Sequence, residues 1–168
     1  MPKQTASQTV GPFFHHMLTP EGYGKPALVG NLLAGDATEG ERIRIRGRLF
    51  DGTGAGVPPA MIEIWQANSR GRYRHPGDTR DDVALDPAFH GFGRAATDGD
   101  GRFACETIKP GPVPGQGNAL QATHINVIVF ARRMNSHAFT RLYFDDEGAA
   151  NETDPVLSAL EPARRTTL

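Results

Sequence analysis

Apolar and polar residues alternate with a period of two along much of the chain, and this pattern predicts β-strands. Residues 42–50 (RIRIRGRLF) alternate arginine with apolar residues, which is typical of a strand with one buried and one solvated face. Further strands are predicted at 61–67, 102–108, 124–131 and 141–144, separated by stretches rich in Gly, Pro and Asp. The run 124–131 is apolar on both faces, which indicates a central strand. Together these strands predict an antiparallel β-sandwich.

Three segments depart from this pattern. Residues 1–40 are rich in Pro and Gly without periodicity, so we expect an irregular N-terminal arm. Residues 68–95 form a long polar stretch, and long loops of this kind often carry function. Near the C-terminus, Asp154 and Pro155 occupy the N-cap and first position of an expected short helix.

Composition limits the possible functions. The 168 residues fit one domain, in which the arm precedes a β-sandwich core at 41–168. Eighteen basic and nineteen acidic residues nearly cancel, without a basic block, so neither a nucleic acid nor an anionic membrane surface is an expected partner. The single Cys105 excludes an internal disulfide and suits a reducing compartment. No apolar run reaches the about 18 residues of a membrane span, and no signal peptide is recognisable, so we expect a cytoplasmic protein.

A possible metal site begins the central strand. His124 and Asn126 are two residues apart, so they project from the same face of that strand. A His-x-His pair there would chelate one metal ion, but an amide oxygen is a poor ligand for a transition metal. The six histidines are scattered and form no HxH or HExxH motif, so ordinary hydrogen-bonded histidines remain the alternative. We expect a metal site that is weak or empty.

Tyr73 and Arg132 are further candidates. Tyr73 stands between Arg72 and Arg74, whose charges would stabilise a phenolate able to bind Fe(III). An ordinary loop tyrosine is the commoner explanation. Arg132 shares the strand face of His124, but at 3.3 Å per residue it would lie roughly 26 Å away. If Arg132 has a function, it serves a second site that another chain completes. The alternative is a solvated arginine at the end of the strand.

Five blocks of sequence add a more specific signal. They are SQTVGPFFH at 7–15, IEIWQANSRGRYRH at 62–75, FGRAATDGDGRF at 92–103, TIKPGPVPG at 107–115 and HINVIVFARRMNSHAFTRLYFDDE at 124–147. Together they resemble the intradiol ring-cleavage dioxygenases, from about residue 5 to the end of the chain. The resemblance implies the β-sandwich of that family.

The resemblance also implies a set of iron ligands. Iron-bearing members hold non-haem Fe(III) with two tyrosines and two histidines, and these positions fall on Tyr73, Val113, His124 and Asn126. Val113 has no donor atom, so the bis-tyrosinate site of the family cannot assemble here. We therefore expect these four positions to form a degenerate iron site, with no bound metal and no catalytic residue in this chain alone.

A role beside another chain follows from the same resemblance. It implies the iron-free alpha chain of an alpha-beta hetero-oligomer, with the Fe(III) carried by a homologous beta chain. The positions that would face the substrate are Thr9, Gly11, Pro12 and Arg132. The guanidinium would pair with a ring carboxylate, and the Gly-Pro backbone would line the pocket wall. Relatives have a small residue at the position of the neighbouring Arg133, so which of the two arginines faces the substrate stays open.

The implied reaction is the cleavage of 3,4-dihydroxybenzoate (protocatechuate) by O2, between its two hydroxyl-bearing carbons, to 3-carboxy-cis,cis-muconate. Two alternatives stand beside it. One is a non-catalytic β-sandwich binding module derived from the family, and the other is a self-sufficient dioxygenase with an altered ligand set. Family members continue past residues 163–168, so it stays open whether final sheet strands are missing, as do the number of alpha-beta pairs and the strictness of substrate preference.

Overall fold

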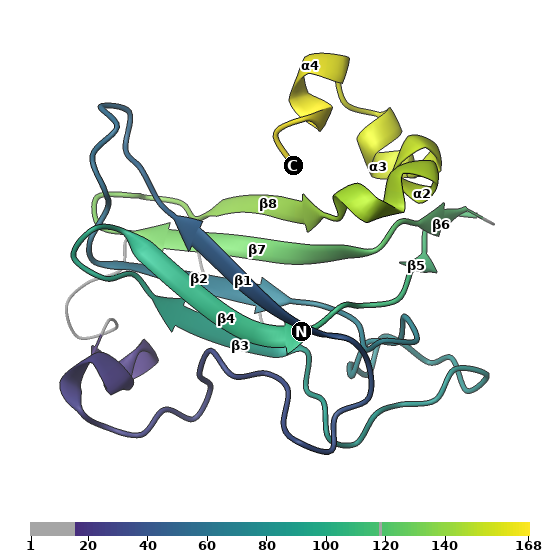
Figure 1. Cartoon of the computed structure of the whole chain (residues 1–168), viewed down its shortest axis with the longest axis horizontal. Helices are drawn as coiled ribbons and strands as arrows, with labels where there is room; N and C mark the ends of the chain where they lie inside the picture. The colour runs from purple at the N-terminus through teal and green to yellow at the C-terminus, as the bar shows by residue number, and fades with distance from the viewer. Residues whose placement is uncertain (1–15, 118) are drawn as a thin grey trace, which may run out of the picture.

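The computed structural model describes residues 16–117 and 119–168. Two antiparallel sheets pack against each other (Figure 1). The first pairs β1 with β4, the second has the order β3-β2-β7-β8, and β5 and β6 form a separate short pair. The strands are β1 (Arg42–Arg48), β2 (Ala60–Trp65), β3 (Phe92–Ala96), β4 (Arg102–Ile108), β5 (Val113–Pro114), β6 (Leu120–Gln121), β7 (His124–Ala131) and β8 (Ala138–Tyr143). The predicted antiparallel β-sandwich is confirmed.

The core lies between the two sheets because each strand turns alternate side chains inward. On β1 the arginines are exposed, whereas Ile43 and Ile45 are half-buried and pack against the core. The facing sheet contributes the buried Ile62 and Ile64 of β2 and Ile125 and Val127 of β7, and β4, the partner of β1, adds Cys105. Each fully buried side chain of this size stabilises the fold by about 1.5–3 kcal/mol relative to exposure. The alternation seen in the sequence thus reports the inner face of each sheet.

The strand predicted to be central has the expected position and bounds. β7 runs from His124 to Ala131 and lies between β2 and β8. In its register Asn126 pairs with Trp65 on one side and with Arg141 on the other. Because directly paired residues share a sheet face, these three side chains and that of His124 all lie on the face turned away from the core.

Two stretches expected to be irregular contain ordered structure. β3 lies partly within the polar stretch 68–95 and was not predicted, and β8 begins at Ala138 rather than at residue 141. The arm over residues 1–40 includes the 3-10 helix η1 (Pro20–Tyr23). It also places Leu33 in the core, where its amide donates to the Glu106 carbonyl at 2.8 Å. The described part of the arm is therefore packed on the sandwich.

The C-terminal segment folds into short helices at the β8 edge of the molecule (Figure 1). The predicted helix is confirmed as α3 (Pro155–Ser158), capped by the Asp154 carboxylate, which accepts from the Val156 and Leu157 amides. Three helices were not predicted: η2 (Asp145–Glu147), α2 (Gly148–Thr153) and α4 (Pro162–Arg165). No helix within the described residues is long and apolar enough to cross a membrane.

Candidate functional site

A cavity of about 520 Å³ opens beside the start of β7. It brings together residues from the end of β2, the loop that follows it, the short pair β5 and β6, and the edge formed by β7 and β8. Three of the four positions carried over from the iron site line it: Tyr73, Val113 and His124. The fourth, Asn126, adjoins it, since its Nδ2 donates to the Tyr73 hydroxyl at 3.4 Å and to the Trp65 carbonyl at 3.2 Å.

His124 is held as a neutral imidazole. Only 3 % of the residue is exposed, and its Nδ1 lies 2.7 Å from the Ala122 carbonyl. A carbonyl can only accept, so the Nδ1 carries the proton and the Nε2 keeps its lone pair. Burial lowers the pKa of His124, and this outweighs the opposing effect of the Ala122 carbonyl. The Nε2 can therefore ligate a metal or accept a hydrogen bond.

Tyr73 does not behave as its sequence neighbours suggest. Burial raises the pKa of Tyr73, so the hydroxyl is a neutral phenol. Arg72 and Arg74 donate instead to the carbonyls of Val83 and Pro87. The prediction that these two guanidinium groups stabilise a phenolate is wrong, because both turn towards the polar loop.

The donor set in the cavity does not fit the iron of the family. Val113 is 4 % exposed and offers no donor atom, and the Asn126 amide is engaged with Tyr73 and Trp65. In residues 16–117 and 119–168, no group of three or more His, Cys, Asp or Glu side chains is placed to hold a metal ion. A two-tyrosine, two-histidine site cannot form from the residues at these positions.

Two arginines in the cavity were missed by sequence reasoning. Arg80 pairs with Asp78 at 2.6 Å, and this hydrogen-bonded pairing lowers the pKa of Asp78 to about 2. Arg141 donates through Nη1 to Gln121 Oε1 at 2.8 Å and to the Tyr143 hydroxyl at 3.3 Å. The available signal for Arg141 was its place on a strand adjacent to β7, which becomes informative only once the register is known.

Arg132 lies at the opposite end of β7. With Arg133 and Met134 it lines a separate cavity of about 500 Å³, whose other wall is formed by residues 49–51 and 56–58. Arg133 adopts a left-handed backbone conformation with φ of 67°. The positions Thr9, Gly11 and Pro12 lie outside the described residues. Arg132 therefore cannot serve the cavity of His124, as the strand spacing predicted.

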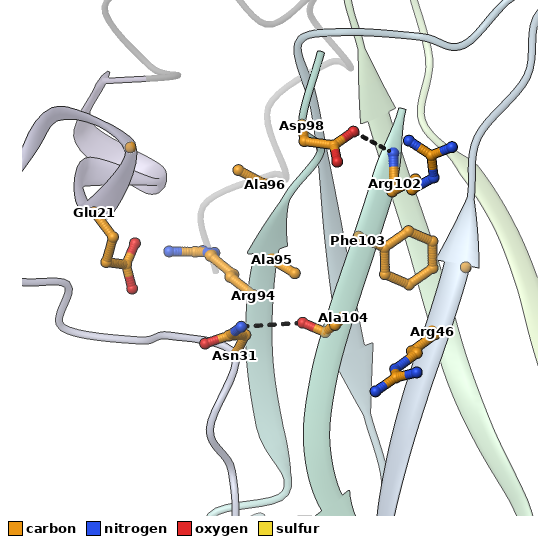
Figure 2. Close-up of a pocket in the computed structure, with 12 residues that line it drawn as sticks. Glu21, Asn31, Arg46, Arg94, Ala95, Ala96, Asp98, Arg102, Phe103 and Ala104 are labelled. Atoms are coloured by element: carbon orange, nitrogen blue, oxygen red, sulfur yellow. Dashed lines mark hydrogen bonds between the residues drawn. The ribbon is translucent and has the colours of Figure 1, made fainter. Parts of the chain in front are cut away.

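A third cavity, of about 490 Å³, lies between η1 and the strands β1, β3 and β4, and none of the predicted site residues lines it (Figure 2). Several of its polar groups have hydrogen-bond partners: Asn31 Nδ2 donates to the Ala104 carbonyl at 3.1 Å. The Arg102 amide donates to Asp98 Oδ1 at 2.8 Å, and the Arg94 side chain pairs with Glu63 at 2.6 Å.

Known proteins resemble the chain along almost its whole length. A family model described as Dioxygenase matches residues 11–167. The protocatechuate 3,4-dioxygenase alpha chain of Burkholderia cepacia is 46% identical over 99% of this chain and 82% of its own length. The corresponding beta chain of that organism is 39% identical over 77% of this chain and 55% of its own length.

A solved structure agrees with these sequence matches. The 3-chlorocatechol 1,2-dioxygenase of Rhodococcus opacus 1CP superposes with a TM-score of 0.63 and 25% identity, over 82% of this chain and 57% of that one. The sandwich, the convergence of the four ligand positions and these matches agree with one another. The chain belongs to the dioxygenase family of intradiol ring-cleavage enzymes.

Proposed function

We propose that the chain is the iron-free alpha subunit of a protocatechuate 3,4-dioxygenase. The observation that carries this proposal is the combination of Val113 and Asn126 at two ligand positions with 46% identity to an alpha chain over almost the whole sequence. A chain that lacks two of four iron donors needs a partner to supply the metal. The match to a beta chain supports a homologous partner in an alpha-beta hetero-oligomer.

The reaction is the cleavage of 3,4-dihydroxybenzoate by O2 to 3-carboxy-cis,cis-muconate. The non-haem Fe(III) of the beta subunit supplies the oxidative chemistry. This chain contributes Arg132, whose guanidinium pairs with the ring carboxylate. Thr9, Gly11 and Pro12 of the arm form part of the pocket wall. The cavity of about 500 Å³ beside Arg132, at the end of β7 away from the relic of the iron site, supports this division of roles.

We further propose that the subunit works in the cytoplasm. Its only cysteine, Cys105, is buried, and no second cysteine exists to form a disulfide within the chain. A fold stabilised without disulfides suits a reducing compartment.

The test is expression of the chain alone and with its partner. Alone, the chain should be colourless and inactive. The co-expressed complex should show the red tyrosinate-to-Fe(III) absorption and protocatechuate-dependent O2 uptake. Tight stoichiometric iron binding by the chain alone would overturn the proposal in favour of a self-sufficient enzyme.

Variants in the complex test the role of Arg132. Arg132→Ala should raise KM for protocatechuate about tenfold or more, because it removes a charge-assisted hydrogen-bond pair, and should weaken discrimination against catechol. Arg133→Ala in parallel identifies which of the two arginines faces the carboxylate. Arg44→Ala, on the exposed face of β1, is the matched control. Unchanged turnover in both Arg132→Ala and Arg133→Ala would favour a binding module instead.

A further inference from the structure

The cavity beside His124 has no part in the proposed function, because the substrate-facing Arg132 lies at the other end of β7. Its volume of about 520 Å³ is nevertheless within the range of about 300–1,000 Å³ typical of small-molecule sites. The cavity keeps a buried imidazole and a guanidinium although two of the four iron-donor positions hold Val113 and Asn126. The walls of this cavity therefore indicate which ligand it would recognise.

Aromatic side chains form one wall of this cavity. The ring of Trp65 is stacked with that of Tyr73 at a centroid distance of 6.1 Å, and His75 meets Trp65 edge-on at 5.7 Å. Val113 and Pro114 add apolar surface from β5. Flat apolar walls of this kind favour a planar ring.

Among the charged side chains that line the cavity, Arg141 is the one outside a salt bridge. The nearby Asp154 carboxylate does not line the cavity and accepts from the Tyr143 hydroxyl and three backbone amides. The Asp78 carboxylate is already paired with Arg80, so these two charges cancel. Arg141 donates through Nη1 to Gln121 and Tyr143, both neutral acceptors, and takes part in none of the salt bridges found among the described residues. A guanidinium in this situation favours an anion, and a carboxylate matches its planar geometry.

Two further groups can recognise a hydroxyl. The Nδ1–H of His124 donates a hydrogen bond to the Ala122 carbonyl, so the unprotonated Nε2 can only accept a hydrogen bond. The Tyr73 hydroxyl accepts from Asn126 and can still donate its own proton. A ring hydroxyl of a ligand can donate to the imidazole and accept from the phenol.

We propose that this cavity is a second binding site, which takes a small monocyclic aromatic carboxylate bearing a ring hydroxyl and holds it without transforming it. Arg141 binds the carboxylate, Trp65 and Val113 enclose the ring, and His124 with Tyr73 receives the hydroxyl. The site is built from this chain alone. It depends neither on a partner nor on iron, so it stands or falls separately from the proposed function.

The chain contains its own reporter for this site. Trp65 is the only tryptophan, and it lines the cavity, so the intrinsic fluorescence of the full chain reports on the cavity wall. Titration of the purified full chain with 4-hydroxybenzoate should change this fluorescence saturably, and calorimetry should give one site per chain. Benzoate, which lacks the hydroxyl, and phenol, which lacks the carboxylate, should each bind about tenfold more weakly or worse.

Matched variants assign the contacts. Arg141→Gln should weaken the binding of 4-hydroxybenzoate about tenfold or more while leaving the binding of phenol unchanged. Arg141→Lys should lose less affinity for 4-hydroxybenzoate than Arg141→Gln does. Arg132→Ala, at the far end of β7, should bind as the parent chain does. Val113→Phe fills the cavity from its apolar wall without altering a polar group, so it should abolish binding even if the Arg141 variants fail to fold.

Several outcomes would overturn the proposal. One is the absence of saturable 4-hydroxybenzoate binding by the parent chain at millimolar concentrations in both measurements. Another is binding that is lost in Arg132→Ala but kept in Val113→Phe, which would locate the ligand at the other end of β7. Equal affinity of the parent chain for 4-hydroxybenzoate and phenol would show that Arg141 does not bind the carboxylate.

Discussion

At the scale of single residues, neighbours in space rather than in sequence set the chemistry of the cavity. Tyr73 has arginines on both sides in the chain, yet burial raises its pKa because those arginines turn to distant carbonyls. Asp78 shows the opposite case, in which a sequence neighbour is also the spatial partner. Its Oδ2 accepts from Arg80 at 2.6 Å and from the Tyr73 amide at 2.9 Å. Asp78 therefore anchors the loop that carries Tyr73.

This anchoring should make stability depend on pH. Asp78 has a folded pKa of about 2 against a usual value of 3.8, mainly because of the Arg80 hydrogen bond. A lowered folded pKa contributes stability above pH 3.8 that is lost as pH falls from about 4 towards 2. Asp78→Asn should cost on the order of 1 kcal/mol at neutral pH, after allowance for solvent screening, and should flatten this acid dependence.

Urea unfolding at a series of pH values between about 3 and 7 measures this effect. Asp81→Asn, an exposed carboxylate in the same loop, is the control and should unfold as the parent chain does. If the free energy of unfolding of Asp78→Asn falls as steeply between pH 4 and 3 as that of the parent chain, Asp78 is not the cause of the acid dependence.

Cys105 gives a second prediction at this scale. Its side chain is fully buried, and burial raises the pKa of the thiol to about 11. Because the thiolate is the reactive form, the native chain should not react with a thiol reagent at neutral pH. Labelling should appear only as the chain unfolds in urea, so its midpoint should match that of the fluorescence change. Rapid labelling of native protein would contradict the packing of β4 against the second sheet.

At the scale of elements, periodicity predicted the strands whose own residues favour them. β4 and β7 have the predicted bounds because both are largely apolar and bounded by turns, and β7 is also rich in β-branched residues. β3 has the sequence FGRAA, which has little β propensity, and it exists because it pairs with β2. Its Gly93 is needed there, since an added Cβ would lie 2.3 Å from the Leu33 side chain of the arm. Contacts between distant segments of this kind cannot be predicted from local pattern.

The α3 cap shows how one side chain connects elements. The Asp154 carboxylate is fully buried and accepts from the Val156 and Leu157 amides at 2.8 Å each. It also accepts from the Ala122 amide at 2.8 Å and from the Tyr143 hydroxyl at 3.2 Å. Asp154 therefore joins the helix to β8 and to the residues that orient His124.

Asp154→Ala should destabilise the fold by about 3 kcal/mol, because it removes a helix cap and leaves two further buried donors unpaired. Asp154→Asn, which keeps one acceptor oxygen, should cost less. Glu161→Ala is the matched control, since Glu161 occupies the N-cap position of α4 without a side-chain cap bond. Equilibrium unfolding in urea measures all three. Equal losses for Asp154→Ala and Glu161→Ala would mean that the cap does not connect the elements as the contacts indicate.

At the scale of the whole molecule, the cavity exists because the sandwich brings distant segments to one end of β7. Residue patterns point to Tyr73, His124 and Asn126, and the family resemblance adds Val113; three of these four line one cavity while Asn126 contacts Tyr73. Arg141 could not be identified in this way, because its role follows from the β7–β8 register. The sequence therefore pointed to residues that the fold brings together at this cavity, but not to the guanidinium of Arg141 in it.

If these four positions are the relic of an iron site, restoring two donors should restore metal binding. The variant with Val113→Tyr and Asn126→His would place two phenols and two imidazoles around the cavity, and its volume of about 520 Å³ gives the new tyrosine ring room beside the buried Val113. Fe(III) stabilises the phenolate forms, so the double variant should bind one iron per chain and gain the tyrosinate-to-iron absorption, which a strong chelator should remove.

Either single substitution should bind iron far more weakly, because three donors leave the set incomplete. Val113→Phe with Asn126→His adds the same bulk without the phenol oxygen and should stay colourless. A double variant that folds but stays colourless in excess iron would show that the four positions converge less closely than the shared cavity indicates.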